Sequence, residues 1–164
     1  MDQKKLNNLF HILKTSEEEE EIQKTIEKVW QVWMISGEAD LDFLMEKGCK
    51  AMSDGNFSDA ITDFSMIIDK NPNYAEGWNK RATAFYLRGD YKKSIDDIKV
   101  TLELEPRHFG ALSGWATICL IIGDELGAFH AFRKLESIYP NRKGLKKKIN
   151  TLSKKLGLDG DRYN

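Results

Sequence analysis

The residues best suited to chemistry lie in one short stretch, Glu105–Trp115, which reads EPRHFGALSGW. A proline, an arginine, a histidine and two glycines beside aromatic residues are the mix expected of a catalytic loop, with His108 as its general base. However, no other histidine or cysteine falls near His108 at the spacing of a metal site or a catalytic pair. We therefore expect His108 to be a structural or solvent-facing turn residue.

The rest of the chain offers no catalytic arrangement. It contains no glycine-rich phosphate loop, no H-E-x-x-H motif and no G-x-S-x-G nucleophile elbow. The three histidines, His11, His108 and His130, are scattered. Asp96 and Asp97 occupy adjacent helical positions, which face different directions. We expect no catalytic residues, and the chain is not predicted to be an enzyme.

The two cysteines, Cys49 and Cys119, are far apart and lack C-x-x-C spacing. This excludes the usual patterns of a zinc site and of a disulfide framework. We expect buried thiols, no metal site and no cofactor.

The composition is that of one ordered, mostly helical domain of 164 residues. Hydrophobic residues make up 41% and charged residues 31%, with only 3 prolines and 12 glycines. The formal net charge is −1, so the whole molecule has no electrostatic attraction to DNA, RNA or an anionic membrane. We do not expect nucleic acid to be a partner on this ground.

Targeting signals are not recognisable in the sequence. No apolar run reaches the roughly 18 residues of a membrane-spanning helix, and residues 1–21 lack the apolar core and cleavage site of a signal peptide. The sequence as it stands predicts a cytoplasmic protein. If Met1 replaced a removed leader, a periplasmic or secreted location would apply instead.

Internal repetition is the strongest pattern in the chain. Proline and glycine each recur three times at one constant interval, and three further columns of small or apolar residues share that interval. The columns are Pro72, Pro106 and Pro140; Gly55, Gly89 and Gly123; Ala60, Ser94 and Ala128; Phe64, Ile98 and Phe132; and Gly48, Ala82 and Ala116. A period of about 34 residues predicts a helical solenoid.

Each repeated unit predicts two helices joined by a glycine turn. In the second unit, residues 76–87 and 91–104 have helical apolar periodicity, and Gly89 lies between them. Glycine suits a short turn because it lacks the Cβ penalty. Pro106 ends the unit because proline has no amide proton to donate. Glu105–His108 thus fills the same position between two units as residues 71–74. We call such a connection between successive repeats a joint, and the stretch that begins at Glu105 is interpreted as one.

These residues resemble the tetratricopeptide repeat, whose pattern is W-x-x-L-G-x-x-Y, then A-x-x-x-F, then P. Trp78 occupies the tryptophan column, and Ala60–Phe64 and Ala128–Phe132 reproduce A-x-x-x-F. The sequence departs from the pattern where Lys47 and Arg81 replace leucine. The stretches AEGWNKRAT and EPRHFGALSG also resemble small stand-alone bacterial proteins of this family.

The resemblance implies an all-α fold, a right-handed superhelical solenoid of antiparallel helix pairs. We expect three repeats at 41–74, 75–108 and 109–142, with helical caps at both ends. Residues 1–40 would be an N-terminal cap, with a degenerate repeat as its expected form, because Ile26, Trp30 and Trp33 precede Ala60, Phe64 and Ile67 by one repeat period.

Two helices are expected in the N-terminal segment. Leu6, Leu9, Phe10 and Leu13 have the spacing of one amphipathic helix. Ser16 and Glu19 form a capping-box signature that would open a second helix, whose apolar face carries Ile22, Ile26, Val29, Trp30 and Trp33.

Residues 143–164 are predicted to be a basic, amphipathic C-terminal cap helix and tail. Leu145, Ile149, Leu152 and Leu156 form one apolar stripe. Seven basic residues, Arg142, Lys143, Lys146, Lys147, Lys148, Lys154 and Lys155, lie in or beside it. They predict a solvated outer face, with phosphate or membrane binding as the alternative.

The resemblance further implies a noncatalytic protein-interaction module. Family members hold a peptide or a partner's helix on the concave surface formed by the first helix of each unit. The matching positions here, our candidate groove, are Met45, Cys49 and Met52; Glu76, Asn79, Lys80, Thr83 and Tyr86; and Ser113, Thr117, Leu120 and Ile121. An apolar anchor would bind near Leu120 and Ile121, and a polar contact near Asn79 and Lys80.

The family's best-known clamp grips the terminal carboxylate of acidic chaperone tails with lysines, asparagines and an arginine. The matching positions here hold Met45, Cys49, Lys80, Gly110 and Gly114, of which only Lys80 could serve. We therefore do not expect chaperone-tail binding. The alternative function is that of a structural, self-associating protein, such as a homodimer, whose groove is closed by its own C-terminal helix or by a second subunit.

Overall fold

The computed structural model describes residues 3–158, and the last six residues of the predicted C-terminal tail lie outside that range. The described residues form helices and no strands. The helices are α1 (Gln3–Thr15), α2 (Glu19–Met34), α3 (Ala39–Ser53), α4 (Phe57–Lys70), α5 (Ala75–Arg88), α6 (Tyr91–Leu104), α7 (Phe109–Ile122), α8 (Glu125–Ile138) and α9 (Leu145–Lys155).

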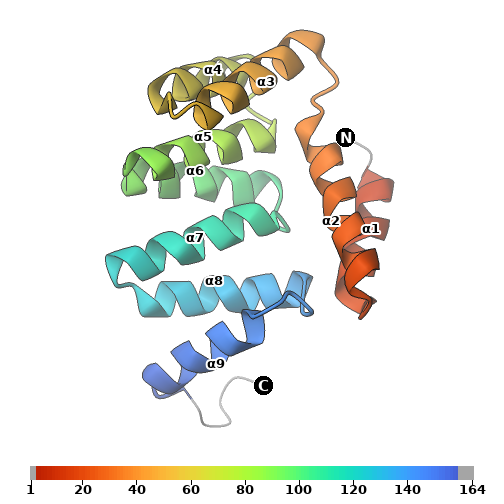
Figure 1. Cartoon of the computed structure of the whole chain (residues 1–164), viewed down its shortest axis with the longest axis vertical. Helices are drawn as coiled ribbons and strands as arrows, with labels where there is room; N and C mark the ends of the chain where they lie inside the picture. Colours follow the sequence, from red (N-terminus) through yellow and green to blue (C-terminus); the bar gives the residue numbers. More distant parts are fainter. Residues whose placement is uncertain (1–2, 159–164) are drawn as a thin grey trace.

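Helices α3 to α8 form three antiparallel pairs stacked in chain order, and α9 follows against α8 (Figure 1). The predicted all-α solenoid of helix pairs is confirmed, although α3 begins two residues before the predicted first unit of 41–74. The turns inside the pairs use glycine as expected, because Gly55, Gly89 and Gly123 have φ angles of 79°, 89° and 82°. Trp78 Nε1 donates a hydrogen bond to the carbonyl of Pro72 at 2.9 Å, which fastens α5 to the preceding joint.

Small residues allow the two helices of each pair to cross closely. Ala60, Ser94 and Ala128 are all buried, and Ser94 Oγ donates a hydrogen bond to the Ala82 carbonyl at 2.7 Å. At Gly48, an added Cβ would lie 2.6 Å from the Phe64 ring. The close approach of α3 and α4 therefore depends on the absence of a side chain at that position.

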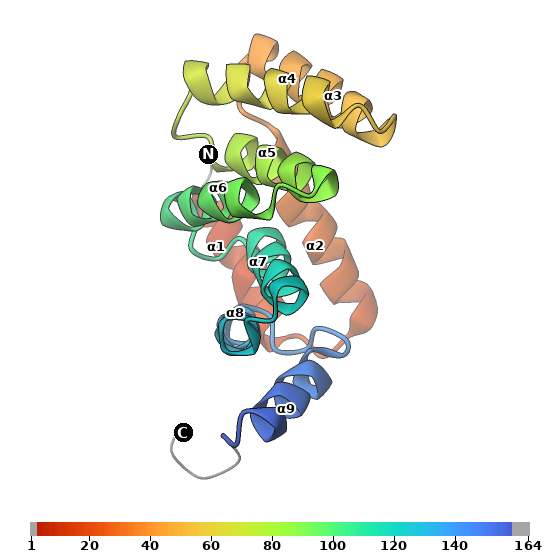
Figure 2. The ribbon, with the colours of Figure 1, turned by 90° about the vertical axis from the view of Figure 1, so that its left-hand side faces the viewer.

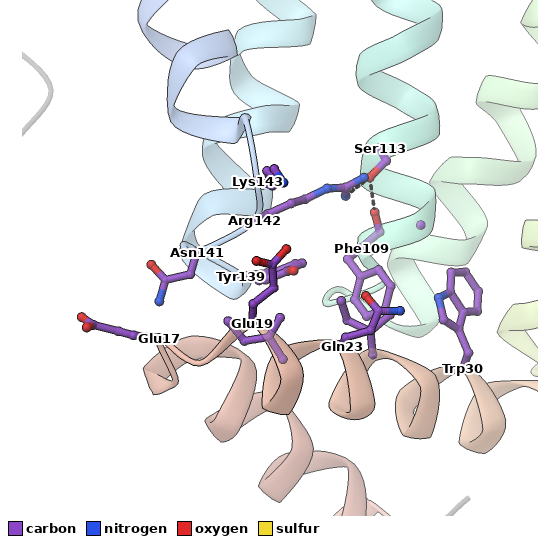
Figure 3. A pocket seen from close by; sticks show the side chains of 13 residues that line it. Glu17, Glu19, Gln23, Trp30, Phe109, Ser113, Tyr139, Asn141, Arg142 and Lys143 are labelled. Carbon is purple, nitrogen blue, oxygen red and sulfur yellow. Dashed lines mark hydrogen bonds between the residues drawn. The ribbon is translucent and has the colours of Figure 1, made fainter.

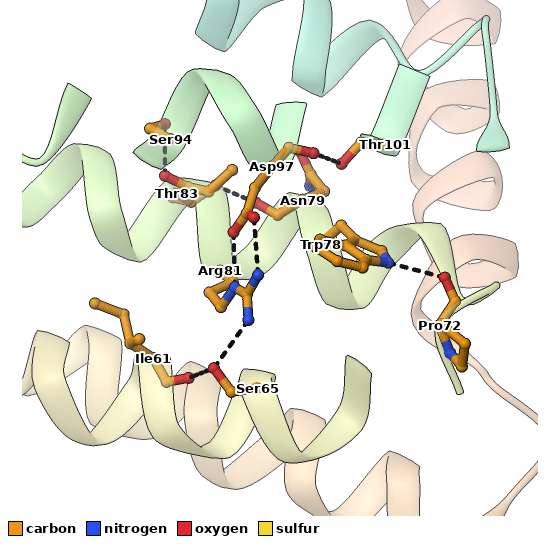
Figure 4. Close-up of polar contacts among 11 residues, drawn as sticks. Ile61, Ser65, Pro72, Trp78, Asn79, Arg81, Thr83, Ser94, Asp97 and Thr101 are labelled. Carbon is orange, nitrogen blue, oxygen red and sulfur yellow. Dashed lines mark hydrogen bonds and ion pairs between the residues drawn. The ribbon is translucent and has the colours of Figure 1, made fainter. Parts of the chain in front are cut away.

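The residues that replace the leucine of the repeat pattern form ion pairs with the second helix of their unit. Lys47 Nζ lies 2.7 Å from Asp63 Oδ1. Figure 4 shows the corresponding pair one repeat later, in which Arg81 Nε and Nη2 donate to the two carboxylate oxygens of Asp97 at 2.7 and 2.9 Å. Arg81 also donates to Ser65 Oγ at 3.1 Å, and so joins α4, α5 and α6.

The ion pair is absent from the third repeat, where both partners differ. Trp115 stands one repeat period after Arg81, and Ala131 stands one repeat period after Asp97. An aromatic residue and a small residue have replaced the charges together. Burying one of these charges without the other would be costly, which explains the paired change.

The N-terminal helices do not occupy the predicted position. Rather than stacking as a further unit before α3, α1 and α2 run along the side of the stack, where α1 contacts α8 and α2 contacts α5 (Figures 1 and 2). The prediction of a degenerate repeat capping the first unit is therefore wrong in this respect. The predicted apolar faces are nevertheless used, because Leu6, Leu13, Val29 and Trp33 are buried in one core with α7 and α8.

The start of α2 also differs from the prediction. The helix begins at Glu19 and not directly after Ser16. Ser16 Oγ accepts a hydrogen bond from the Glu18 amide at 3.2 Å and donates one to Glu21 Oε2 at 2.6 Å. Ser16 thus orders the short link from α1, but it does not form a capping box with Glu19.

Helix α9 uses the predicted apolar stripe. Leu145, Ile149 and Leu152 are buried against α8, and its lysines are exposed. Helix α9 does not fold over the third repeat, because Leu120 and Ile121 remain 45% and 48% exposed. The alternative in which the C-terminal helix closes the groove by burying these two residues is therefore wrong.

Candidate functional site

The twelve predicted groove residues divide into buried and accessible positions. Met45 and Glu76 are 1% exposed, so the prediction that they face an open groove is wrong for them. Asn79 is 6% exposed, but it still lines a cleft. The half-buried residues are Cys49, Met52, Lys80, Thr83, Tyr86 and Ser113, and the exposed ones are Thr117, Leu120 and Ile121.

Four of these positions lie together in a cleft of about 260 Å³ between α5 and α7, namely Asn79, Thr83, Tyr86 and Thr117. Gly110 and Gly114 of α7 line the opposite wall, and Gly114, which has no side chain, keeps that wall open. The cleft thus combines amide and hydroxyl groups with an aromatic ring. Such a surface can hydrogen-bond a peptide backbone while packing on a side chain.

Cys49 is a poor nucleophile in this setting. Burial is the main cause that raises the pKa of its thiol above the usual value, with Lys80 acting in the opposite direction. The reactive thiolate is therefore disfavoured near neutral pH.

A second and larger cleft, of about 680 Å³, was not predicted. It lies between α2 on one side and the start of α7 with the α8–α9 loop on the other (Figure 3). Acidic residues of the α2 side face basic residues of the loop across an apolar floor. The lining residues include Glu17, Glu19, Ile22, Ile26, Trp30, Phe109, Ser113, Arg142 and Lys143.

Arg142 extends from the loop toward α7 in this cleft (Figure 3). Its Nη1 donates to Ser113 Oγ at 2.5 Å, and Ser113 Oγ in turn donates to the Phe109 carbonyl at 2.6 Å. Burial lowers the pKa of the Arg142 guanidinium, with the Tyr139 phenol acting in the opposite direction. A positive charge is thus held in a partly desolvated position.

His108 is a structural residue and is fully buried, so the solvent-facing alternative is wrong. Its Nδ1 accepts a hydrogen bond from the Ala111 amide at 3.1 Å and caps α7. Because Nδ1 is an acceptor, Nε2 carries the proton and donates to Glu76 Oε2 at 2.8 Å. The ring stacks on Trp33 with 4.0 Å between centroids, which connects α2 to the joint between the second and third repeats.

Glu76 stabilises this joint from the second repeat. Its Oε1 accepts a hydrogen bond from Asn79 Nδ2 at 3.2 Å and lies 3.5 Å from Lys80 Nζ. Lys80 Nζ also lies 5.5 Å from the centre of the Trp30 ring. Lys80 is therefore engaged with its own protein rather than free to grip a ligand.

Replacing Gly110 by alanine should destabilise the protein by about 1–3 kcal/mol through overpacking. An added Cβ would lie 2.7 Å from Cη2 of Trp30, so α2 would have to shift away from α7. At Gly114, by contrast, a Cβ would meet only Ile98 at 3.6 Å. Gly114→Ala should therefore stabilise the protein by about 0.5–1 kcal/mol, the usual gain of alanine over glycine in a helix.

The stabilities of the two glycine variants are measured by urea denaturation, with Gly114→Ala as the matched control for Gly110→Ala. In a Trp30→Leu background, Gly110→Ala should cost much less than in the parent, because the clashing ring atoms are gone. Equal stabilities of the Gly110→Ala and Gly114→Ala variants would contradict the close packing of α2 against α7.

No group of three or more His, Cys, Asp or Glu side chains within residues 3–158 is placed to hold a metal ion. Over the same residues, no helix has both the length and the apolar character needed to cross a bilayer.

Comparison with known proteins shows what the chain resembles. No protein-family model matches it. A TPR repeat-containing protein of Rhizobium etli is 34% identical over 152 residues, which is 93% of this chain and 74% of the relative.

Solved structures share the fold at low sequence identity. The MamA protein superposes with a TM-score of 0.66 at 17% identity, over 95% of this chain and 85% of MamA. The first TPR domain of Spaghetti (RPAP3), bound to the HSP90 peptide SRMEEVD, superposes with a TM-score of 0.67 at 18% identity, over 73% of this chain and 94% of that domain. The chain has three stacked helix pairs, and 93% of its own length is similar to the Rhizobium protein. It therefore belongs to the tetratricopeptide repeat proteins.

Proposed function

We propose that this protein is a noncatalytic interaction module that holds a segment of a partner protein on its concave face, between α2, α5 and α7. The observation that carries the proposal is the pair of adjacent clefts of about 260 and 680 Å³, which share Gly110. Because the two clefts share a lining residue, one bound segment can occupy both of them. The peptide bound by the related Spaghetti domain supports a peptide ligand of some kind.

The partner segment is expected to be extended or helical and to differ from a chaperone tail. In the smaller cleft, the hydroxyl groups of Thr83 and Thr117 donate to helix carbonyls and can still accept a hydrogen bond from a ligand, and Tyr86 provides an aromatic face. Lys80, the only residue suited to the family's carboxylate clamp, is paired with the buried Glu76 carboxylate. Leu120 and Ile121, at the end of α7, would add an apolar anchor beyond the cleft.

Blocking the smaller cleft should weaken peptide capture without unfolding the protein. Thr117 is exposed and lines the cleft, so Thr117→Arg places a long charged side chain across it. We expect random ten-residue peptides displayed on phage to be enriched by the parent chain and at least about tenfold less by Thr117→Arg, a difference near 1.4 kcal/mol of binding free energy. Peptides from the selection would then be synthesised and their affinities measured by fluorescence anisotropy.

Ser137→Arg is the matched control, because Ser137 is exposed on α8 and lines neither cleft. Both variants should keep the circular dichroism and melting temperature of the parent. Peptides that bind the Thr117→Arg and Ser137→Arg variants equally well would show that the smaller cleft is not the binding surface.

Self-association remains a second candidate because one edge of the stack is apolar. Leu87, Leu120, Ile121, Ile122 and Leu126 are each 45% to 54% exposed, at the end of α5 and around the α7–α8 turn. Burying this edge against a second copy would remove apolar surface from water. Sedimentation over a concentration series tests this: Ile122→Glu should convert any dimer to a monomer, and a parent chain that stays monomeric at the highest concentration would eliminate the candidate.

A further inference from the structure

Arg142 has more hydrogen-bonding capacity than its own protein uses. A guanidinium carries five N–H donors, and within residues 3–158 the Arg142 side chain makes one hydrogen bond, to Ser113 Oγ. No carboxylate of the described residues forms an ion pair with it, although Arg81 and Arg107 each have one. A partly buried cation without an anionic partner is unfavourable by itself and becomes favourable when an anion binds.

Three clefts meet at Arg142. Besides the cleft of about 680 Å³, it lines one of about 460 Å³ with Lys146 and Lys147 and one of about 60 Å³ with Lys148. The smallest cleft shares Thr117 with the cleft between α5 and α7. Basic residues of the C-terminal segment thus lie around Arg142, at one end of the surface proposed for the partner segment.

We propose that Arg142 and the lysines beside it bind an acidic side chain within the partner segment, which enters the concave face between α2 and the α8–α9 loop. This inference rests on the proposed function and specifies the chemistry of its ligand. The arginine would form a bidentate pair with an aspartate or glutamate, and Lys143, which is exposed at the same cleft, would contribute a second positive charge.

The geometry favours an acidic side chain over a chain terminus. The clefts of about 680 and 460 Å³ both have Arg142 in their lining, the first toward α2 and the second toward Lys146 and Lys147. A bound segment can therefore continue past the arginine on both sides. A terminal carboxylate would leave one of these clefts empty.

The opposite wall favours a protein over a polyanion such as a nucleic acid. Glu17 and Glu19 face the arginine side of the cleft and would repel a continuous row of phosphates. Ile22, Ile26 and Phe109 form an apolar lining that suits a hydrophobic residue next to the acidic one. The fitting ligand is a peptide in which an acidic and an apolar residue lie close together.

The experiment compares the peptides that different variants select from the same random ten-residue phage library. The full chain, Arg142→Gln and Lys143→Glu are the test proteins, and Lys154→Gln is the matched control because Lys154 is exposed on α9 and lines none of these clefts. We expect the parent and Lys154→Gln to enrich peptides with Asp or Glu beside an apolar residue. Synthetic copies should bind Arg142→Gln and Lys143→Glu at least about tenfold more weakly.

Lys143→Glu keeps the test decisive if Arg142→Gln fails to fold, because Lys143 is exposed. Replacing Glu or Asp by Gln or Asn in the selected peptide should cause a similar loss, whereas amidating its C-terminus should not. A 20-nucleotide single-stranded DNA serves as the polyanion probe and should bind the parent more weakly than the peptide.

The outcomes separate the inference from the proposed function. Peptides that bind through Thr117 but lack acidic residues, or acidic peptides unaffected by Arg142→Gln and Lys143→Glu, would overturn the inference alone. Dependence on a free C-terminus, or tighter binding of the DNA through Arg142, would overturn it as well. A parent chain that enriches no peptide at all would overturn both.

Discussion

Replacing Trp33 by alanine should lower the free energy of unfolding by about 3–5 kcal/mol, the usual cost of removing a large buried aromatic residue. Trp33 is 2% exposed and is among the largest fully buried side chains of the described residues. It lies where α2 meets the joint between the second and third repeats. Its removal therefore weakens the contact that holds both N-terminal helices on the stack.

The neighbours of Trp33 explain why this cavity would not collapse easily. The indole stacks on His108 at an interplanar angle of 11° and contacts Phe10 and Phe109, with ring centroids 5.9 and 5.0 Å away. These partners come from α1, α7 and the joint before α7. His108 is itself fixed by Glu76, so it cannot move to fill the space.

A phenylalanine at the same position should be tolerated better. The indole Nε1 of Trp33 is buried without a hydrogen-bond partner, so Trp33→Phe removes an unsatisfied donor while keeping an aromatic ring. We expect Trp33→Phe to cost less than half as much as Trp33→Ala. Urea denaturation followed by circular dichroism measures both.

Ile35→Ala is the control, because Ile35 is 65% exposed just after the same helix. It should change the stability by less than about 0.5 kcal/mol. If Trp33→Ala were as stable as Ile35→Ala, then α2 would not be packed against the repeats as described.

The repeats were predictable because their determinants are local and recur. A glycine that must adopt a positive φ, a proline that ends a helix and a small residue at a helix crossing each act within one unit. The helix pairs and the joints between them could therefore be predicted from the spacing of residues such as Gly89, Pro106 and Ser94. The stacking order then follows from chain order, because each unit contacts its neighbours.

The position of α1 and α2 was not predictable by the same reasoning. An amphipathic face shows that a helix packs, but it does not show against which surface. The match in spacing between Ile26, Trp30 and Trp33 and the first repeat's Ala60, Phe64 and Ile67 suggested a further repeat. In the structure, Trp30 packs instead against Gly110, far away along the chain, where only a glycine leaves room for it.

The larger cleft could not be predicted for the same reason, since α2 forms one of its walls. Arg142 was recognised only as part of a basic segment, because its side-chain direction depends on the α8–α9 loop and on Ser113. Glu76 was misplaced because a charged residue on a first helix is normally solvated. Its burial depends on the pairing with His108, which is 32 residues away.

One structural feature was present in the sequence and was missed. Lys47 and Arg81 are separated by one repeat period, and so are Asp63 and Asp97. Two charge columns of opposite sign with the repeat period indicate an ion pair repeated in successive units. Comparing Asp97 only with its neighbour Asp96 does not reveal this periodic relationship.

Replacing Asp97 by alanine should destabilise the protein by about 3–5 kcal/mol, because it leaves a buried charge unpaired. The Arg81 side chain is 18% exposed and that of Asp97 is 7% exposed. Asp63→Ala should cost much less. Its partner Lys47 is 59% exposed and can return to water, and one oxygen of the Asp63 carboxylate is buried without a hydrogen-bond partner.

The third repeat provides the compensating variant, because it carries Trp115 and Ala131 at the positions of Arg81 and Asp97. Arg81→Trp combined with Asp97→Ala removes both charges and introduces the pair that the fold already accepts one unit later. We expect the double variant to be at least about 2 kcal/mol more stable than Asp97→Ala alone, since an apolar pair often replaces a buried ion pair without loss. A double-mutant cycle by urea denaturation measures the coupling. If the stability losses of the two single variants simply added in the double variant, the unpaired charge would not determine the cost of Asp97→Ala. The second and third repeats would then differ in their packing around this pair.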